Sequence, residues 1–169
     1  MKLRLTVTLV LAALATATSA QAQKKFSGKQ QCAKADPMHV VQVADRPDHS
    51  MILGSQRCTW SGAELGGLQL TEEVGTFVSD AMGNGSRDDG YTVGTAANGD
   101  KYYVKFTGTS AMKGGMPTSA RCNWAFTGGT GKLTGLTGKG TCKGTFNSDG
   151  SANFEMDGRY QLPRAKAAK

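Results

Sequence analysis

The sequence is poor in residues that hold metal ions. Its 169 residues include only two histidines, His39 and His49. No two of its four cysteines have the short C-x-x-C spacing that zinc sites commonly use. We therefore expect no metal site and no cofactor of any kind. An even number of cysteines favours two disulfides in an oxidising compartment.

The sequence also lacks an apolar run long enough to cross a membrane. A bilayer crossing takes about 20 apolar residues, and the one long apolar run, residues 5–17, is shorter. Lys2 and Arg4 precede this run, and small residues around Ala20 and Ala22 follow it. A basic start, a short apolar stretch and an Ala-x-Ala ending are typical of a secretory signal peptide.

These features predict three parts and an exported protein. We expect a signal peptide at residues 1–22, one folded domain at 23–162 and a flexible basic tail at 163–169. The mature chain should be periplasmic or extracellular and should not span the membrane.

A phosphate-binding loop is absent, although glycine and lysine alternate in residues 128–146, GGTGKLTGLTGKGTCKGTF. A P-loop requires Gly, four residues and then Gly-Lys-Ser/Thr, because its backbone amides surround the phosphates and its hydroxyl reaches a metal. Leu133 follows Lys132, and Gly140 follows Lys139. These glycines therefore predict no nucleotide site.

Positive charge is in moderate excess. Without Lys2 and Arg4, 18 basic residues stand against 13 acidic ones, which is a net charge of +5. The basic residues are scattered, and no nucleic-acid-binding motif accompanies them. We expect no nucleic-acid partner.

The chain does contain clear alternation of apolar and polar residues. In the stretch ANFEMDGRYQL, Phe154, Met156 and Tyr160 share one face, opposite charged residues, which is typical of a strand with one solvated side. KYYVKF and RCNWAF alternate in the same way. The predicted strands are residues 38–44, 49–60, 68–79, 91–97, 101–112, 118–128, 138–147 and 152–162.

This pattern predicts an all-β fold. Asn98-Gly99 and Gly114-Gly115 are typical of tight turns between antiparallel strands. Eight strands can close into a barrel around side chains or one small ligand, and glycines within strands permit the necessary bends. We therefore predict a single antiparallel β-barrel of about eight strands.

The strand order also pairs the cysteines. The strands that contain Cys122 and Cys142 are successive, so they should be antiparallel neighbours with both thiols on one face. Cys32 and Cys58 then pair by elimination. The second disulfide would fasten an otherwise loose N-terminal segment onto the barrel.

The run WAFTGGTGKLTGLTGKGTCKGTF, which begins at Trp124, resembles the W-x-x-x-GGTGK pattern of bacterial members of the allene oxide cyclase barrel-like family, relatives of plant dirigent proteins. DRPDHSMIL and NGDKYYVKFTG are similar to two further pieces of that family, so the resemblance spans residues 45–160. It implies a lipocalin-like antiparallel barrel. It also implies that loop 128–138 crosses between adjacent strands with Leu133 and Leu136 turned inward.

The resemblance implies less about activity. Plant allene oxide cyclases close a ring in a fatty-acid-derived epoxide without a cofactor, and dirigent proteins guide radical coupling. Their catalytic positions have no local motif that matches this sequence residue by residue. Because one fold hosts many functions, the resemblance supplies no active site.

Aromatic residues of the predicted strands and one carboxylate are the candidate ligand-lining residues. A carboxylate inside an apolar barrel is a candidate for binding or catalysis, although Glu72 and Glu73 can also flank a bulge. Aromatic side chains can equally fill the core. The candidates are Trp60, Glu73, Tyr103, Phe106, Trp124 and Tyr160. The DRPDHS stretch at residues 45–50 is interpreted as a turn rather than as an acid–base or metal site.

Three functions are compatible with these residues. We expect a barrel that binds an apolar small molecule or a partner surface without chemistry, because no nucleophile with a base and an orienting group is recognisable. A cofactor-free cyclase or isomerase acting on a hydrophobic substrate is the alternative, and it requires an open cavity with inward polar groups. A solid interior would instead favour a structural or protein-interaction role.

Exported protein should begin at Gln23, or at Gln21 if cleavage follows Ala20. Both sites follow an alanine in the small-residue ending that signal peptidases accept. N-terminal sequencing of exported material measures this. Exported protein that retains Met1 would contradict the prediction.

Overall fold

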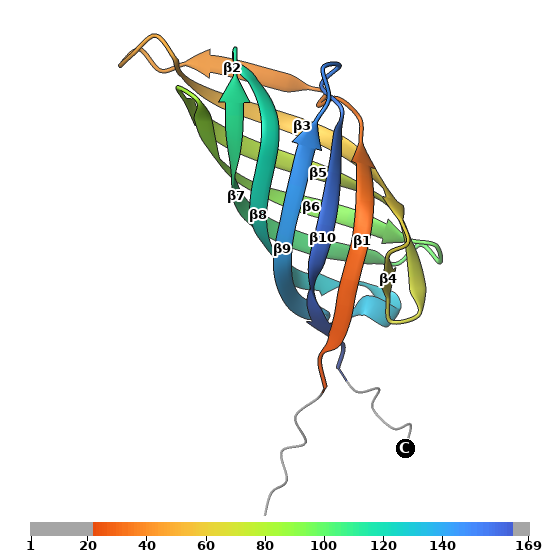
Figure 1. Cartoon of the computed structure of the whole chain (residues 1–169). Helices are drawn as coiled ribbons and strands as arrows, with labels where there is room; N and C mark the ends of the chain where they lie inside the picture. Colours follow the sequence, from red (N-terminus) through yellow and green to blue (C-terminus); the bar gives the residue numbers. More distant parts are fainter. Residues whose placement is uncertain (1–21, 164–169) are drawn as a thin grey trace, which may run out of the picture.

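Residues 22–163 form strands and one short 3₁₀ helix in the computed structural model of the protein (Figure 1). The predicted signal peptide, apart from Ala22, and residues 164–169 of the predicted tail lie outside the described residues. The elements are β1 (Lys24–Cys32), β2 (Met38–Gln42), β3 (His49–Ser61), β4 (Glu64–Leu65), β5 (Leu68–Met82), β6 (Gly85–Ala96), β7 (Lys101–Lys113), β8 (Met116–Gly129), η1 (Gly131–Leu133), β9 (Thr137–Phe146) and β10 (Ala152–Gln161).

Eight of these strands close into an antiparallel barrel. From β5 to β10 each strand pairs with the next one in the sequence. β1 then pairs with both β10 and β3, and β3 pairs with β5, which completes the ring. The predicted all-β, eight-stranded antiparallel barrel is confirmed. The short strands β2 and β4 add to β3 and β5 outside the ring.

The N-terminal segment is not loose, as the sequence had suggested, but forms strand β1. All nine of its residues pair with β10, from Lys24 opposite Tyr160 to Cys32 opposite Ala152. Phe26, Gln30 and Cys32 are buried, whereas Lys24, Lys25 and Lys29 are exposed. Alternation by hydrophobicity is weak in KKFSGKQQC because one inward residue is glycine and another is glutamine. Pairing on both edges makes this segment a strand.

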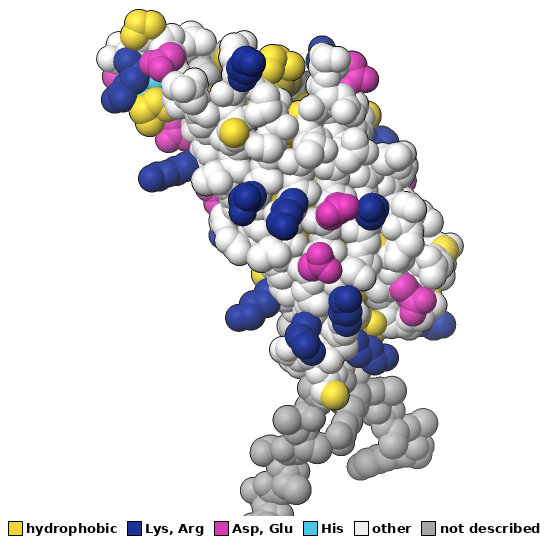
Figure 2. Space-filling view, viewed as in Figure 1, with side chains coloured by type: hydrophobic (Ala, Val, Ile, Leu, Met, Phe, Trp, Pro, Cys, Tyr) yellow, Lys and Arg dark blue, Asp and Glu magenta, His cyan; other side chains and the backbone are white. Residues whose placement is uncertain are grey.

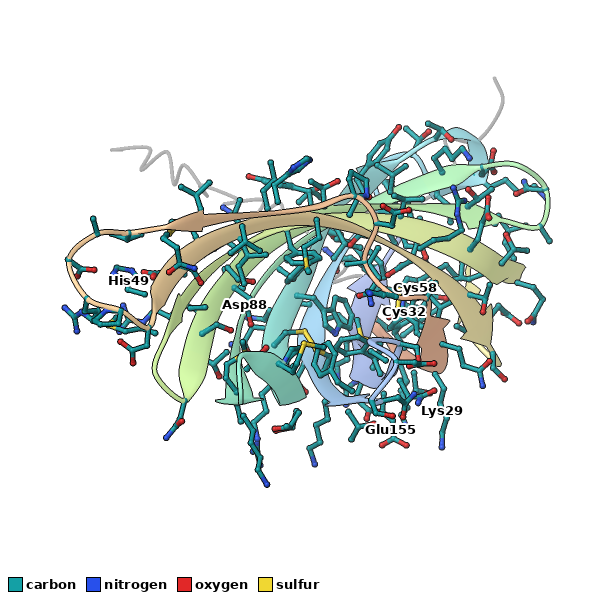
Figure 3. The ribbon with its side chains drawn as sticks, turned by 90° about the horizontal axis from the view of Figure 1, so that it is seen from above. Lys29, Cys32, His49, Cys58, Asp88 and Glu155 are labelled. Atoms are coloured by element: carbon teal, nitrogen blue, oxygen red, sulfur yellow. A yellow bond between two sulfur atoms is a disulfide. The ribbon has the colours of Figure 1, made fainter. Side chains whose placement is uncertain are left out.

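Two disulfides connect neighbouring strands, with the pairing expected from the sequence. Cys32 on β1 is bonded to Cys58, its register partner on β3. Cys122 on β8 is bonded to Cys142, its register partner on β9. Figure 3 shows Cys32 and Cys58 side by side in the barrel wall. The first disulfide therefore covalently secures the contact that closes the ring.

The loop between β8 and β9 closes one end of the barrel, at the bottom of Figure 1. It contains η1, and Leu133 and Leu136 are fully buried, in agreement with the orientation that the family resemblance implied. Leu65 and Tyr160 pack in the same core cluster. This end of the barrel is therefore filled with side chains.

Aromatic rings fill the barrel just above this closed end. The ring of Phe26 makes edge-to-face contacts with Trp60, Trp124 and Phe126, at centroid distances of 5.7, 5.3 and 5.4 Å. A Cβ atom at Gly140 or Gly158 would overlap the Trp124 ring. Glycine at these two strand positions therefore lets the indole lie directly against β9 and β10.

The outer wall is mostly polar where β9, β10 and β1 lie side by side (Figure 2). Lys139, Arg159 and Lys25 occupy adjacent outward positions on these three strands. Lys29 and Glu155 form an ion pair of 3.0 Å between two exposed side chains. Exposed pairs contribute little to stability, so this wall is a solvated surface.

Removal of the Cys32–Cys58 disulfide by a Cys32→Ala, Cys58→Ala double substitution should lower the free energy of unfolding by about 3 kcal/mol. The bond closes a loop with a sequence separation of 26, and the chain-entropy model gives that magnitude. Urea unfolding of oxidised protein measures it. The matched control is Cys122→Ala with Cys142→Ala, whose separation of 20 predicts a similar loss. A loss below about 1 kcal/mol in the first variant would contradict the prediction.

Candidate functional site

The half of the barrel opposite the closed end contains a cavity of about 530 Å³. This volume lies within the range of roughly 300–1,000 Å³ that is typical of small-molecule sites. Inward residues of all eight barrel strands line it. Most of the lining is apolar and includes Ile52, Phe77, Val104, Phe106, Phe146 and Phe154.

The mouth of the cavity carries exposed methionines. Met38 on β2, Met82 at the end of β5 and Met116 at the start of β8 all line it and are 49, 41 and 48% exposed. Methionine is unbranched and polarizable, so it adapts to apolar groups of different shape. The methionines therefore give the mouth an apolar contact surface beside the exposed polar residues Lys34, Gln42 and Asp48.

A hydrogen-bonded chain of three side chains lies at the base of the cavity. The indole Nε1–H of Trp60 donates to the Tyr102 hydroxyl oxygen at 2.5 Å. The Tyr102 hydroxyl in turn donates to Glu73 Oε2 at 2.8 Å. Glu73 is 8% exposed and lines the cavity. A carboxyl group therefore lies where the filled core meets the open space.

Two local features bring Glu73 and Tyr102 together. The β5–β6 register shifts between Leu70 and Glu72, and this bulge at Thr71 turns Glu73 inward and Glu72 outward. Gly94 lies between Glu73 and Tyr102 on the intervening strand β6. A Cβ atom there would overlap the Tyr102 ring and hydroxyl, so glycine lets the tyrosine cross to the carboxyl group.

Burial controls the protonation of this cluster. It raises the pKa of Glu73, and the contacts with Tyr102, Gln30 and Trp60 oppose that rise only in part. Burial and the adjacent carboxylate raise the pKa of Tyr102. Both shifts favour the neutral forms. The cluster is thus biased toward a carboxylic acid O–H and a phenol rather than two anions.

Gln30 lies beside this chain on β1. It is opposite Trp60 in the β1–β3 register, is 4% exposed and lines the cavity. Its amide is near enough to influence the pKa of Glu73, but its Nε2 atom has no partner within hydrogen-bond geometry among residues 22–163. A buried N–H donor without an acceptor is costly.

A second carboxyl group faces the cavity from β6. Asp88 accepts hydrogen bonds from the hydroxyls of Ser86, at 2.8 Å, and Ser110, at 2.7 Å. Figure 3 shows Asp88 on the inner side of the barrel wall. With Glu73, it places two acidic side chains in the cavity lining.

Four of the six residues predicted to line a ligand site do line this cavity: Trp60, Glu73, Phe106 and Trp124. Tyr103 does not, because it alternates with the inward residues Tyr102 and Val104 and points outward, where it is 37% exposed. Tyr160 faces inward but lies at the filled end, where its hydroxyl accepts the Gly66 N–H at 2.9 Å.

The sequence prediction overlooked three polar residues of the lining: Gln30, Asp88 and Tyr102. Tyr102 could have been found, because the alternation in KYYVKF already groups it with Val104 and Phe106. Asp88 shares one face of its strand with Ser86 and Gly90 in GSRDDGY. This signal is weak because all three residues are polar or small. Gln30 could not be placed before β1 was recognised.

The DRPDHS turn holds a histidine between two carboxylates near the mouth. His49 Nδ1 is 2.6 Å from Asp45 and its Nε2 is 2.8 Å from Asp80 on β5. These contacts raise the pKa of His49, chiefly through the hydrogen bond with Asp45. Both ring nitrogens are engaged by the carboxylates, and residues 22–163 contain no group of three or more His, Cys, Asp or Glu side chains arranged to hold a metal ion. The contact fastens the β2–β3 turn to β5.

No known protein-family model and no curated protein sequence matches the chain. The fold is similar to the solved structure of a pterocarpan synthase dirigent protein, with 14% sequence identity and a TM-score of 0.44. The alignment covers 94% of this chain and 100% of the dirigent chain. In the described part of the chain, no helix has the length and apolar character that a membrane crossing demands. Fold and site define a closed eight-stranded antiparallel barrel with an interior cavity.

The Glu73→Gln variant should not show the loss of stability that we expect of the wild-type protein as pH rises. The folded-state pKa of Glu73 is raised, so its contribution is fully present below the unfolded pKa and is lost as pH rises through the folded pKa. Each pKa unit by which folding raises the pKa of Glu73 costs about 1.4 kcal/mol of folding stability at high pH. Thermal unfolding followed from pH 5 to 9 measures the difference between the two proteins.

The matched control is Glu72→Gln, which changes the adjacent outward residue of the same strand. Glu72 is exposed and accepts from Arg57 Nη1 at 3.3 Å. Other titrations, including that of His49, are common to the three proteins and cancel in the comparison. Equal pH slopes for wild-type and Glu73→Gln proteins would show that Glu73 does not carry the predicted shift.

Proposed function

We propose that this protein is an exported barrel that binds an apolar small molecule in its interior. The observation that carries this proposal is the cavity of about 530 Å³, which has mostly apolar walls and exposed methionines at its mouth. Burial of apolar ligand surface contributes about 25 cal/mol per Å². A preformed, partly enclosed apolar cavity therefore gives a hydrophobic molecule a large favourable free energy of transfer from water.

Two further observations support the exported state and the kind of barrel. The two disulfides indicate an oxidising, non-cytoplasmic environment. The glycine-rich β8–β9 loop, with its two buried leucines, fits the expected crossing in the dirigent-related barrel family. Affiliation with that family is part of this proposal.

Catalysis is the second candidate function, and Glu73 is the observation that favours it. A buried carboxyl group with a raised pKa can act as a general acid at neutral pH. It would act without a cofactor on an uncharged, hydrophobic substrate, as in an isomerase or cyclase. Recovery of a bound ligand unchanged after prolonged incubation distinguishes simple binding from this reaction.

A partner surface is the third candidate, supported by apolar residues on the outer wall. Val41 lies opposite Met51 across β2 and β3, and Leu53 lies opposite Val78 across β3 and β5. All four side chains are exposed. Adjacent exposed apolar residues are typical of interaction sites, so this wall of the barrel suits a protein contact better than the polar β9–β10–β1 wall does.

Ala120→Phe should weaken binding of Nile red, an uncharged apolar dye, by at least about tenfold. Ala120 lines the cavity on β8, and a phenyl ring there occupies space that a ligand needs. Dye fluorescence at increasing protein concentration measures the dissociation constant, and a thermal scan checks that the variant is folded.

The matched control is Ala125→Phe, the same change at an outward position of the same strand. It should bind the dye as the wild-type protein does. Failure of the wild-type protein to bind Nile red saturably, or equal binding by the Ala120→Phe variant, would contradict the proposed cavity function.

A further inference from the structure

One buried hydrogen-bond donor at the base of the cavity has no acceptor among the described residues. Gln30 is only 4% exposed. Its Nε2 atom is that donor. Leaving such an atom unpaired costs about 1–3 kcal/mol. Native interiors pair most buried polar atoms, so each exception requires a structural reason.

Glu73 lies next to Gln30 and is a second polar group at the base of the cavity. Its Oε2 atom accepts the Tyr102 hydroxyl at 2.8 Å. In the neutral form that burial favours, the carboxyl group itself has an O–H to donate. The Trp60 N–H and the Tyr102 O–H are already used as donors in the hydrogen-bonded chain that leads to Glu73.

Gln30 Nε2 therefore lacks an acceptor at the inner end of an apolar cavity. We propose that Gln30 and Glu73 together bind the carbonyl oxygen of a long, uncharged, apolar ligand whose hydrocarbon part extends toward the mouth. This inference rests on the proposed function and specifies the ligand class that the same cavity selects. A carbonyl oxygen has two lone pairs, so it can accept from both donors.

The charge of the lining excludes an anionic head group at this position. Glu73 and Asp88 are the acidic side chains on inward strand positions of the cavity. The cations of the lining, Lys34 and Arg121, are exposed side chains. A carboxylate at the base would lose its hydration beside Glu73 without a buried counter-charge. A neutral carbonyl group avoids that cost.

The cavity wall above the cluster suits a hydrocarbon chain. Phe106, Phe77 and Ile52 line the path between the base and the methionine-rich mouth. The ligand is therefore expected to enter with its polar end first, which places its only acceptor where the unpaired donors are and its apolar part against apolar walls.

The test compares 2-undecanone, undecane and decanoate as ligands of the folded protein. Displacement of Nile red from the cavity, followed by the loss of dye fluorescence, reports the binding of all three ligands in the same way. We expect wild-type protein to bind 2-undecanone about tenfold more tightly than undecane, and decanoate more weakly than the ketone at pH 8. Gln30→Leu should abolish the preference for the ketone over undecane while leaving undecane binding in place.

The matched control is Gln42→Leu, the same substitution at the exposed mouth of the same cavity; it should keep the ketone preference. In ligand-free protein, Gln30→Leu should be at least as stable as wild type, because it removes the unpaired donor. If this variant does not fold, Gln30→Met, which also lacks the amide, replaces it.

The outcomes separate this inference from the proposed function. If neither undecane, the ketone nor Nile red binds, the cavity function itself is wrong. If undecane and the ketone bind equally, or if Gln30→Leu retains the preference, the carbonyl site is wrong and the apolar cavity remains. Decanoate binding as tightly as the ketone at pH 8 would overturn the choice of an uncharged ligand.

Discussion

The position of β1 between β10 and β3 is the constraint on which the rest of the structure depends. Without it, β10 and β3 would each present an unpaired edge, and the sheet would not close. The same nine residues carry Phe26, which joins the aromatic core, and Gln30, which reaches the base of the cavity. The disulfide from Cys32 to Cys58 crosses the closing contact between β1 and β3. Closure, core and candidate site therefore share one short segment.

The interior is divided between a filled half and an open half, and the arrangement of rings and glycines sets the division. Toward the closed end, Trp124 lies against two glycines, and Leu133 and Leu136 plug the bottom. Toward the mouth, the inward side chains leave a cavity of about 530 Å³. Glu73 and Tyr102 lie at the boundary, where burial is sufficient to favour their neutral forms. An apolar ligand would thus meet neutral hydrogen-bonding groups at its inner end.

This polar boundary gives the barrel chemistry that its fold does not supply. Small barrels host unrelated functions, so the fold alone assigns none. The hydrogen-bonded chain from Trp60 through Tyr102 to Glu73 depends instead on particular side chains from three strands and on Gly94 of a fourth. The proposed binding and the alternative of acid catalysis would both use this cluster, and they differ in whether the proton of Glu73 is shared with a ligand or transferred to it.

The sequence by itself determined the features that depend on local alternation and turn chemistry. The strands around Phe106, Trp124 and Met156 follow from period-two patterns, and glycine-containing turns separate several of them. The succession of two such strands also sufficed to pair Cys122 with Cys142. Only the tertiary structure decided whether Glu72 or Glu73 faces inward, because a single bulge at Thr71 reverses the parity. The tertiary structure also made residues 24–32 a strand, since that segment is ordered by pairing with β10 and β3. It placed Tyr160 in the filled end, because the depth of a residue along a barrel depends on how distant strands are staggered. Alternation specifies the face of a strand on which a residue lies, whereas closure of the ring specifies which residues from distant strands meet inside.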